Sequence, residues 1–355
     1  AVNVTADNTF AAASLTQTAG TGTTTFSGNV TTTAAGTNLN LTTATIDIDA
    51  SVVTNGGVVD LNATTLVDLA TGQSITTTGD ADAEAGGAID IDVSGTGTVN
   101  LAGSLVTTGG AATTAGDGGA GGAVTIDTAN GVIAVGAITT TGGADDGDDN
   151  DGGAAGAITL NTGSSNVITL NGNLTAVGGA GDTQGGGGNV TVSDAASLGA
   201  GIAIDTGATA GTITFSSTLN GTQTLALTAG TGNIDFDSTV GNTAALGAVT
   251  IASAVNVTAD NTFAAASLTQ TAGTGTTTFS GDVTTTAAAG TNVDLTTATI
   301  DINASVVTSG GAVDLNATTL VDLATGESIT TTGDADAEAG GAIDIDVSGT
   351  GTVNL

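Results

Sequence analysis

The first 101 residues of this chain return near its C-terminus, and this repetition limits the folds that are open to it. Residues 1–101 recur as residues 254–355 with seven substitutions and one inserted alanine. A fixed period is the mark of repeat architectures, in which each unit packs only against its neighbours. We therefore interpret residues 1–355 as one continuous window on a tandem array, in which 254–355 begins a second copy of a repeat that occupies 1–253.

A shorter period lies inside the long one. Residues 210–319 divide into five consecutive 22-residue segments without a gap. Within them, alternation such as Ile300, Asp301 and Ile302 predicts strands with one buried face. Two or three such strands per segment predict one rung of a parallel β-solenoid, an all-β fold in which backbone groups pair with the next rung.

A second kind of rung is longer. The anchors Ile75, Leu105, Ile138 and Leu174 are 30, 33 and 36 residues apart, with inserts rich in Gly and Asp between them. These inserts are predicted as variable loops on one face, with glycine supplying positive φ at the corners. A string of β-sandwich modules is the competing fold, but such modules run to about 100 residues. The 22-residue period and the presence of only six Phe disfavour it.

Composition removes several classes of function. The chain has no Lys, Arg, His, Cys, Met, Trp, Tyr or Pro, and its net charge is −34. Nucleic acid and anionic membranes are bound through Lys and Arg, so neither is an expected partner. No apolar run approaches the roughly 18 residues of a membrane span, so no membrane insertion is predicted here. Carboxylates without a base, a thiol or an aromatic sugar platform do not predict an enzyme.

Divalent cations are the expected partners of such a polyanion, and two acidic segments are candidate sites. Asp146, Asp148 and Asn150 have the 1, 3, 5 spacing of a calcium loop, although Asp151 stands where glycine is usual and no Glu follows at the twelfth position. Ca²⁺ is therefore the expected cofactor, and a solvated acidic tip is the alternative. The first set of candidate ligands is Asp145, Asp146, Asp148, Asp149, Asn150 and Asp151. The second set is Asp80, Asp82 and Glu84, which recur as Asp334, Asp336 and Glu338.

Carboxylates also lie within the strands, as Asp47 with Asp49, Asp90 with Asp92, and Asp235 with Asp237. Alternation turns them outward, where neighbours in adjacent rungs repel one another. Cations or high ionic strength are therefore expected to stabilise the fold. Four differences between the copies exchange amide and acid, which predicts solvent-facing positions: Asn29/Asp282, Asn40/Asp294, Asp49/Asn303 and Gln73/Glu327.

Threonine runs such as 76–78 and 139–141 raise ice binding as a minor alternative. An ice-binding face needs threonine at the same place in nearly every rung, whereas Ala, Asn and Asp interrupt these columns. The default interpretation is that threonine serves as an ordinary β-former.

The segment from Gly232 to Gly281 and the rungs of the form ITTTGG…GGAITLN resemble giant β-strand-repeat surface proteins of bacteria. They are similar to filamentous-haemagglutinin-type adhesins and autotransporter passenger domains. The resemblance implies a right-handed parallel β-helix that is secreted to the extracellular bacterial cell surface. It implies a fibre, sheath, adhesin stalk or biofilm-matrix role, with self-association end to end or laterally. The alternative is an adhesin that binds glycans or a partner cell through the Gly/Asp loops.

Overall fold

A computed structural model describes residues 1–33, 37–80, 82–113, 116–147, 150–163, 166–288, 290–333 and 339–355. These residues contain 36 strands and no helix, and the strands pair in parallel from rung to rung. The predicted all-β parallel solenoid is confirmed. Contacts divide the chain into two compact units, which are described separately. Unit 1 comprises residues 1–195 and 205–211, and unit 2 comprises 196–204 and 212–355.

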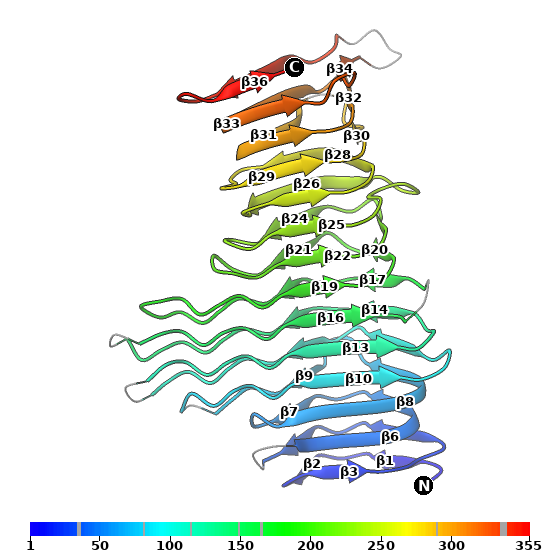
Figure 1. The fold of residues 1–355 in the computed structure, drawn as a ribbon. Coiled ribbons are helices and arrows are strands. Elements are labelled where there is room, and N and C mark those ends of the chain that lie inside the picture. The colour runs from blue at the N-terminus through cyan, green and yellow to red at the C-terminus, as the bar shows by residue number, and fades with distance from the viewer. Residues whose placement is uncertain are drawn as a thin grey trace. The chain divides into compact units, whose positions relative to one another are not determined.

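Each rung of unit 1 contributes strands to three faces, and Figure 1 shows these strands in blue to green. The threonine face consists of β2 (Phe10–Ala12), β5 (Val30–Thr32), β7 (Val52–Thr54), β9 (Ser74–Thr76), β12 (Ser104–Val106), β15 (Ile138–Thr139) and β18 (Leu174–Thr175). The carboxylate face consists of β3 (Leu15–Gln17), the first halves of β6 (Thr37–Ile48) and β8 (Val58–Leu69), β10 (Ile89–Val93), β13 (Val124–Thr128), β16 (Ile158–Asn161) and β19 (Val190–Val192). The third face consists of β1 (Val4–Ala6), β4 (Thr23–Phe26), the second halves of β6 and β8, β11 (Thr98–Leu101), β14 (Ile133–Val135) and β17 (Ile168–Leu170).

The register of unit 1 matches the spacing of the sequence anchors. Ile75 pairs with Leu105, Leu105 with Ile138, and Ile138 with Leu174, which confirms the rungs of 30, 33 and 36 residues. All four anchor side chains are buried. Stacking like on like lets each apolar side chain pack on its counterpart in the next rung. Full burial of one such side chain stabilises the fold by roughly 1.5–3 kcal/mol before the cost of ordering it.

Unit 2 is built on the same plan. One face holds β20 (Ala196–Leu198), β23 (Leu219–Asn220), the start of β28 (Phe263–Gln270), β30 (Val283–Thr285), β32 (Val306–Ser309) and β34 (Ile329–Thr332). A second holds β22 (Ile213–Phe215), β25 (Ile234–Phe236), β27 (Val257–Ala259), β29 (Thr276–Phe279), the ends of β31 (Thr291–Ile302) and β33 (Ala312–Leu323), and β36 (Thr352–Asn354). The third holds β24 (Leu225–Thr228), β26 (Leu246–Ser253), the remainders of β28, β31 and β33, and β35 (Ile343–Val347). The division between the units falls within β21 (Ile202–Asp205).

An aromatic stack fills part of the unit 2 core. The rings of Phe215 and Phe236 stack with centroids 5.5 Å apart, and edge-to-face contacts continue through Phe263 to Phe279. The chain has only six Phe, and four of them gather in consecutive rungs of this unit. Such pairs contribute about 0.5–1.5 kcal/mol beyond their buried area.

Candidate functional site: glycine arms and carboxylate columns

Four extensions, which we call arms, leave unit 1 between the threonine face and the carboxylate face. They are arm 1 (residues 77–88), arm 2 (107–123), arm 3 (140–157) and arm 4 (176–189). Figure 1 shows them as long cyan and green extensions on one side. The chain runs outward along each arm from the threonine face and returns to the carboxylate face. The predicted variable inserts are therefore present, and their described parts stack on one another.

A buried threonine closes the base of the first three arms. In arm 3, Thr140 Oγ1 donates to Gly156 O at 2.6 Å, and Gly156 N donates to Thr140 O at 2.9 Å. The same pair of bonds joins Thr77 to Gly87 and Thr107 to Gly122. In arm 4 the position is Ala176, which keeps only the backbone bond from Gly188. The threonine runs were interpreted only as ordinary β-formers, although alternation after Ile138 places Thr140 inward and could have predicted its burial.

Glycine lets the outgoing and returning segments of the arms touch through their main chains. Gly143 N donates to Gly119 O at 2.8 Å, and Gly143 O accepts from Gly153 N at 2.9 Å. A Cβ atom on Gly143 would lie 2.0 Å from Gly110 O, and one on Gly153 would lie 1.9 Å from Gly119 O. No real side chain tolerates such a contact, so these positions require glycine.

Hydrogen bonds also run from arm to arm along the stack. Gly109 N donates to Thr141 O at 2.9 Å in the outgoing layer, and Gly121 N donates to Ala154 O at 2.8 Å in the returning layer. Backbone N–H and C=O groups therefore pair both between the outgoing and returning segments and between neighbouring arms. These bonds satisfy main-chain polar groups that glycine, which has no side chain, cannot satisfy by other means. Among the described glycines of the arms, only Gly147 has a positive φ, of 90°. In the arms, close approach is what requires glycine, whereas positive-φ glycines such as Gly56, Gly72 and Gly95 lie at corners between the strands of a rung, as expected.

The tip of arm 3 carries the first predicted set of ligands. Asp145 N donates to Ala180 O at 2.9 Å, and its Oδ2 is buried without a hydrogen-bond partner. Asn150 Nδ2 donates to Asp146 Oδ1 at 3.0 Å. Asp151 N donates at 2.9 Å to the Oδ1 atom of Asp117 on arm 2, a residue that the sequence analysis did not select. Asp148 and Asp149 lie outside the described residues.

The second predicted set is more open. Asp80, Asp82 and Glu84 are all exposed on arm 1, and Asp82 accepts a hydrogen bond from the Thr113 hydroxyl of arm 2. Their counterparts Asp334, Asp336 and Glu338 lie outside the described residues. Within the described ranges, no three acidic side chains come close enough together to hold a metal ion.

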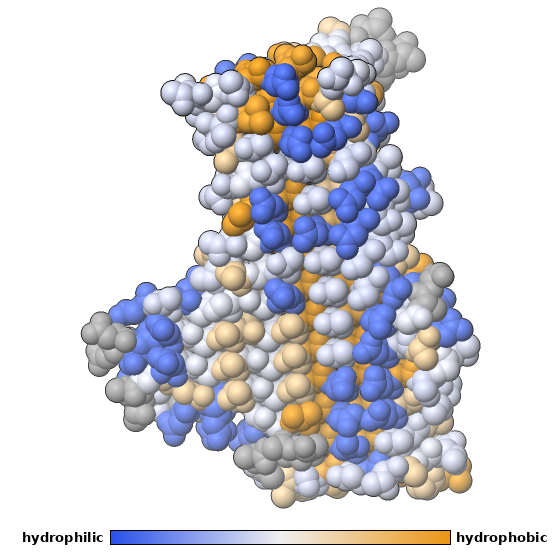
Figure 2. All heavy atoms as spheres, viewed as in Figure 1, coloured by the Kyte–Doolittle hydropathy of each residue, from blue (hydrophilic) through white to orange (hydrophobic). Residues whose placement is uncertain are grey.

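Columns of outward carboxylates form where strands pair in register. Asp60 of β8 pairs with Asp90 of β10, and Asp92 of β10 pairs with Asp127 of β13. Figure 2 shows hydrophilic side chains gathered in vertical bands on this side of unit 1. An open hollow of about 500 Å³ lies beside Asp92, Asp127 and Asn161. The prediction that strand carboxylates meet between rungs is confirmed for Asp90 and Asp92, whereas Asp235 pairs in register with Thr214 and Thr258.

This crowding changes the acidity of several carboxyls. Partial burial, then Asp92, Asp60 and Asp127, raises the pKa of Asp90 above its usual range. Partial burial, then Asp127 and Asp60, raises the pKa of Asp92. In unit 2, partial burial followed by the charges of Asp237 and Asp260 raises the pKa of Asp235. With no Lys or Arg in the chain, the columns carry uncompensated negative charge that a cation would relieve.

Asparagine takes the place of the missing cations as a donor to these carboxylates. Asn100 Nδ2 donates to Asp68 Oδ1 at 2.6 Å across the third face. Asn316 Nδ2 donates to Asp314 Oδ1 at 2.7 Å in unit 2. None of the eight residues in the amide and acid exchanges is buried, which confirms the expectation for those positions.

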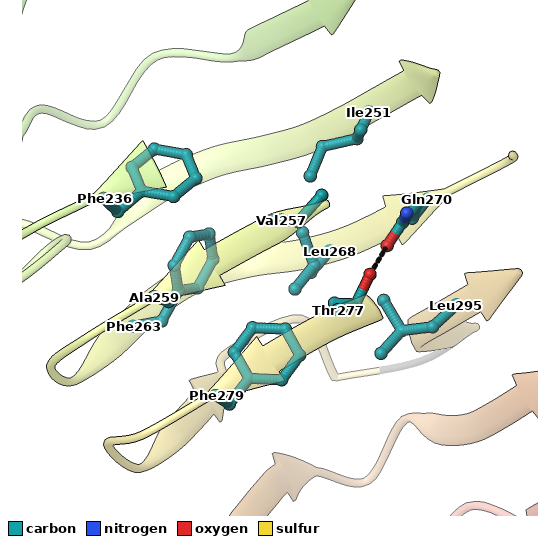
Figure 3. A pocket seen from close by; sticks show the side chains of 10 residues that line it. All are labelled: Phe236, Ile251, Val257, Ala259, Phe263, Leu268, Gln270, Thr277, Phe279 and Leu295. Carbon is teal, nitrogen blue, oxygen red and sulfur yellow. Dashed lines mark hydrogen bonds between the residues drawn. The ribbon is translucent and has the colours of Figure 1, made fainter. Parts of the chain in front are cut away.

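A buried polar pair, Gln270 and Thr277, lies in the unit 2 core. Figure 3 shows Gln270 and Thr277 pointing toward one another among Phe263, Leu268 and Leu295. Thr277 Oγ1 donates to Gln270 Oε1 at 2.6 Å, and Gln270 Nε2 is buried without a partner. The surrounding space does not admit a water molecule, so this is a packing feature and not a ligand site. Alternation along the strand places Gln270 on the same inward side as Leu268, two residues earlier, and this pattern predicts its burial.

Comparisons with known protein families, curated proteins and solved structures find no significant match. Among the described residues, none forms a helix long and apolar enough to cross a membrane.

Proposed function

We propose that this chain is a structural repeat protein of the bacterial surface, an acidic β-solenoid that forms a fibre, sheath or adhesin stalk. The observation that supports this role best is the parallel pairing from rung to rung within each unit. In such a fold, repetition adds length without new chemistry. The near-identical long repeat and the resemblance to surface proteins support the extracellular location.

The repeat distance between rungs tests this proposal. Fibre diffraction or electron cryomicroscopy of the purified chain should show a repeat of about 4.8 Å along the stacking direction. A chain that remains unfolded in physiological salt, or lacks this repeat, would contradict the structural role.

Calcium is the proposed stabilising cofactor. It is supported by the buried, unpartnered Oδ2 atom of Asp145, by neighbouring Asp146, and by the carboxylate columns without counter-cations. Hard cations prefer such oxygen ligands. Calcium bound between stacked arms would reduce repulsion within unit 1.

Adhesion through the arms is a second candidate, favoured by their projection from one side with exposed Asp82, Asp117 and Asp182 at their tips. Changing these three residues together to Asn preserves shape and removes charge. Loss of attachment to glycan-coated surfaces or cells, with an unchanged melting temperature, would favour adhesion. Unchanged attachment would indicate that the arms have a structural role and do not mediate adhesion.

A further inference from the structure

The threonine face of unit 1 is the one face whose strands contain no acidic residue. Its seven strands read FAA, VTT, VVT, SIT, SLV, IT and LT. The carboxylate face carries Asp60, Asp90, Asp92 and Asp127, and the third face carries Asp47 and Asp68. In a chain with 34 acidic residues and no Lys or Arg, this face alone offers strands that do not repel an identical surface.

The outward side chains of this face form regular columns. One column is set by register and reads Thr31, Val53, Thr76, Val106, Thr139 and Thr175. A parallel column continues into the arms, where Thr108 Oγ1 donates to Thr78 Oγ1 at 2.9 Å. All are β-branched, so their side chains are stiff and lose little entropy when they are covered.

We propose that the threonine face is the surface through which two copies of this chain associate laterally, each placing this same face against the other. Each threonine hydroxyl both donates and accepts a hydrogen bond, and each valine presents methyl groups, so the face is complementary to itself. A symmetric contact of this kind needs a self-complementary patch. The face has no charge with which to select a charged partner.

Size and charge set the conditions for this contact. Seven strands about 4.8 Å apart, each two or three residues long, cover about 300 Å². This is below the roughly 800 Å² per partner of a standard interface, so a weak contact is expected. The remaining surface is anionic, so association is expected to strengthen with salt, which shortens the Debye length to about 3 Å near 1 M. Within unit 2, register sets a similar column of Ala264, Thr284, Val307 and Thr330.

This inference rests on the proposed structural role, because it names the surface by which stalks would bundle. The two fail differently. A folded solenoid that never associates would overturn the inference and leave the stalk role in place. A chain without the rung repeat would overturn the stalk role itself.

Sedimentation velocity of the whole chain, in low salt and near 1 M salt, tests the contact. The double variant Val106→Asp with Thr139→Asp puts two charges on the threonine face. The control Ala134→Asp with Thr159→Asp adds the same charge on the other two faces. We expect the unaltered chain and the control to form dimers in high salt. For the variant of the threonine face, we expect the dissociation constant of the dimer to be at least about tenfold higher. An unaltered chain that stays monomeric, or equal effects of both variants, would overturn the proposal.

Cysteine cross-linking provides a readout that does not depend on added charge. The chain has no cysteine, so a single one forms a disulfide only between copies. Val106→Cys should yield covalent dimers on mild oxidation in high salt, and Thr159→Cys should not. Equal cross-linking at both positions would contradict the face assignment. If the Val106→Cys protein stays monomeric and instead adsorbs to ice, the proposal is overturned and the threonine face is an ice-binding surface.

Discussion

The Asn40 side-chain amide donates to the Asp60 carboxylate of the next rung at 2.6 Å, whereas its counterpart in the second copy is a carboxylate, Asp294, paired in register with Asp314. Partial burial and then the charge of Asp314 raise the pKa of Asp294. One position in the repeat therefore exists as a hydrogen bond in unit 1 and as a repulsive contact in unit 2.

Exchanging the two residues should exchange their effects. Asn40→Asp should lower the free energy of unfolding by about 1 kcal/mol, the scale of one hydrogen bond, and Asp294→Asn should raise it by a similar amount. Asn29→Asp is the matched control, because Asn29 Oδ1 accepts from Ser51 N at 3.2 Å and Asp282 Oδ1 accepts from Ser305 N at 3.1 Å. Denaturant titration would measure all three. If Asn29→Asp also lowers the free energy of unfolding, then the net charge of the chain, and not the local contact, determines the effect of Asn40→Asp.

Acid should stabilise the carboxylate columns. The folded-state pKa of Asp90 is raised above the ordinary 3.8. The stabilisation is therefore complete below the unfolded-state pKa and is lost as pH rises through the raised pKa. The melting temperature should fall as the pH rises from about 4 toward neutrality. Asp90→Asn should raise it at neutral pH and flatten this dependence. Asp182→Asn, on an exposed arm tip, controls for removal of one charge, and an equal effect from it would contradict the prediction.

Calcium should raise the melting temperature more than sodium at equal ionic strength, and a chelator should reverse the gain. Asp145→Asn removes the charge of the carboxylate whose Oδ2 atom is buried without a partner, so it should reduce the difference between the two salts. Thermal melts followed by circular dichroism would measure this. Equal melting in calcium and sodium would refute the cofactor.

Two glycines in the arms should respond differently to the same change. Gly143→Ala places a Cβ atom 2.0 Å from Gly110 O, whereas a Cβ on Gly186 meets nothing within 4 Å. We expect Gly143→Ala to destabilise unit 1 by about 3 kcal/mol, at the upper end for overpacking, and Gly186→Ala to be nearly neutral. Hydrogen exchange of the arm amides would locate the loss. Similar stability in both variants would contradict the requirement for close approach.

The buried polar pair of unit 2 should be replaceable as a pair. Gln270→Leu alone leaves the buried Thr277 hydroxyl without its acceptor and should cost about 1–3 kcal/mol. Adding Thr277→Val removes that donor as well, and the double variant should recover most or all of the loss, because Gln270 Nε2 already lacks a partner. Denaturant titration of the two variants and the unaltered chain would measure this. A double variant as unstable as the single one would indicate that the pair fixes the register.

Period and alternation made the solenoid predictable, down to the pairing of Ile75 with Leu105. Alternation also placed Asp90 and Asp92 outward. The sequence predicted the inserts as loops on one face but not their stacking, because a glycine segment has no periodicity and the contact between Gly143 and Gly119 depends on two segments lying side by side. The tip contact of Asp151 with Asp117 was missed for the same reason, since it joins neighbouring rungs 34 residues apart.

The parallel ladder has a mechanical consequence. Its hydrogen bonds point from rung to rung, so tension along the stacking direction of a unit loads them a few at a time at an end. Each short rung released, about 20 residues of chain, would extend from a rise of about 4.8 Å to about 70 Å. A tether built this way would yield gradually under drag and dissipate energy, and its rungs could re-form when the load falls.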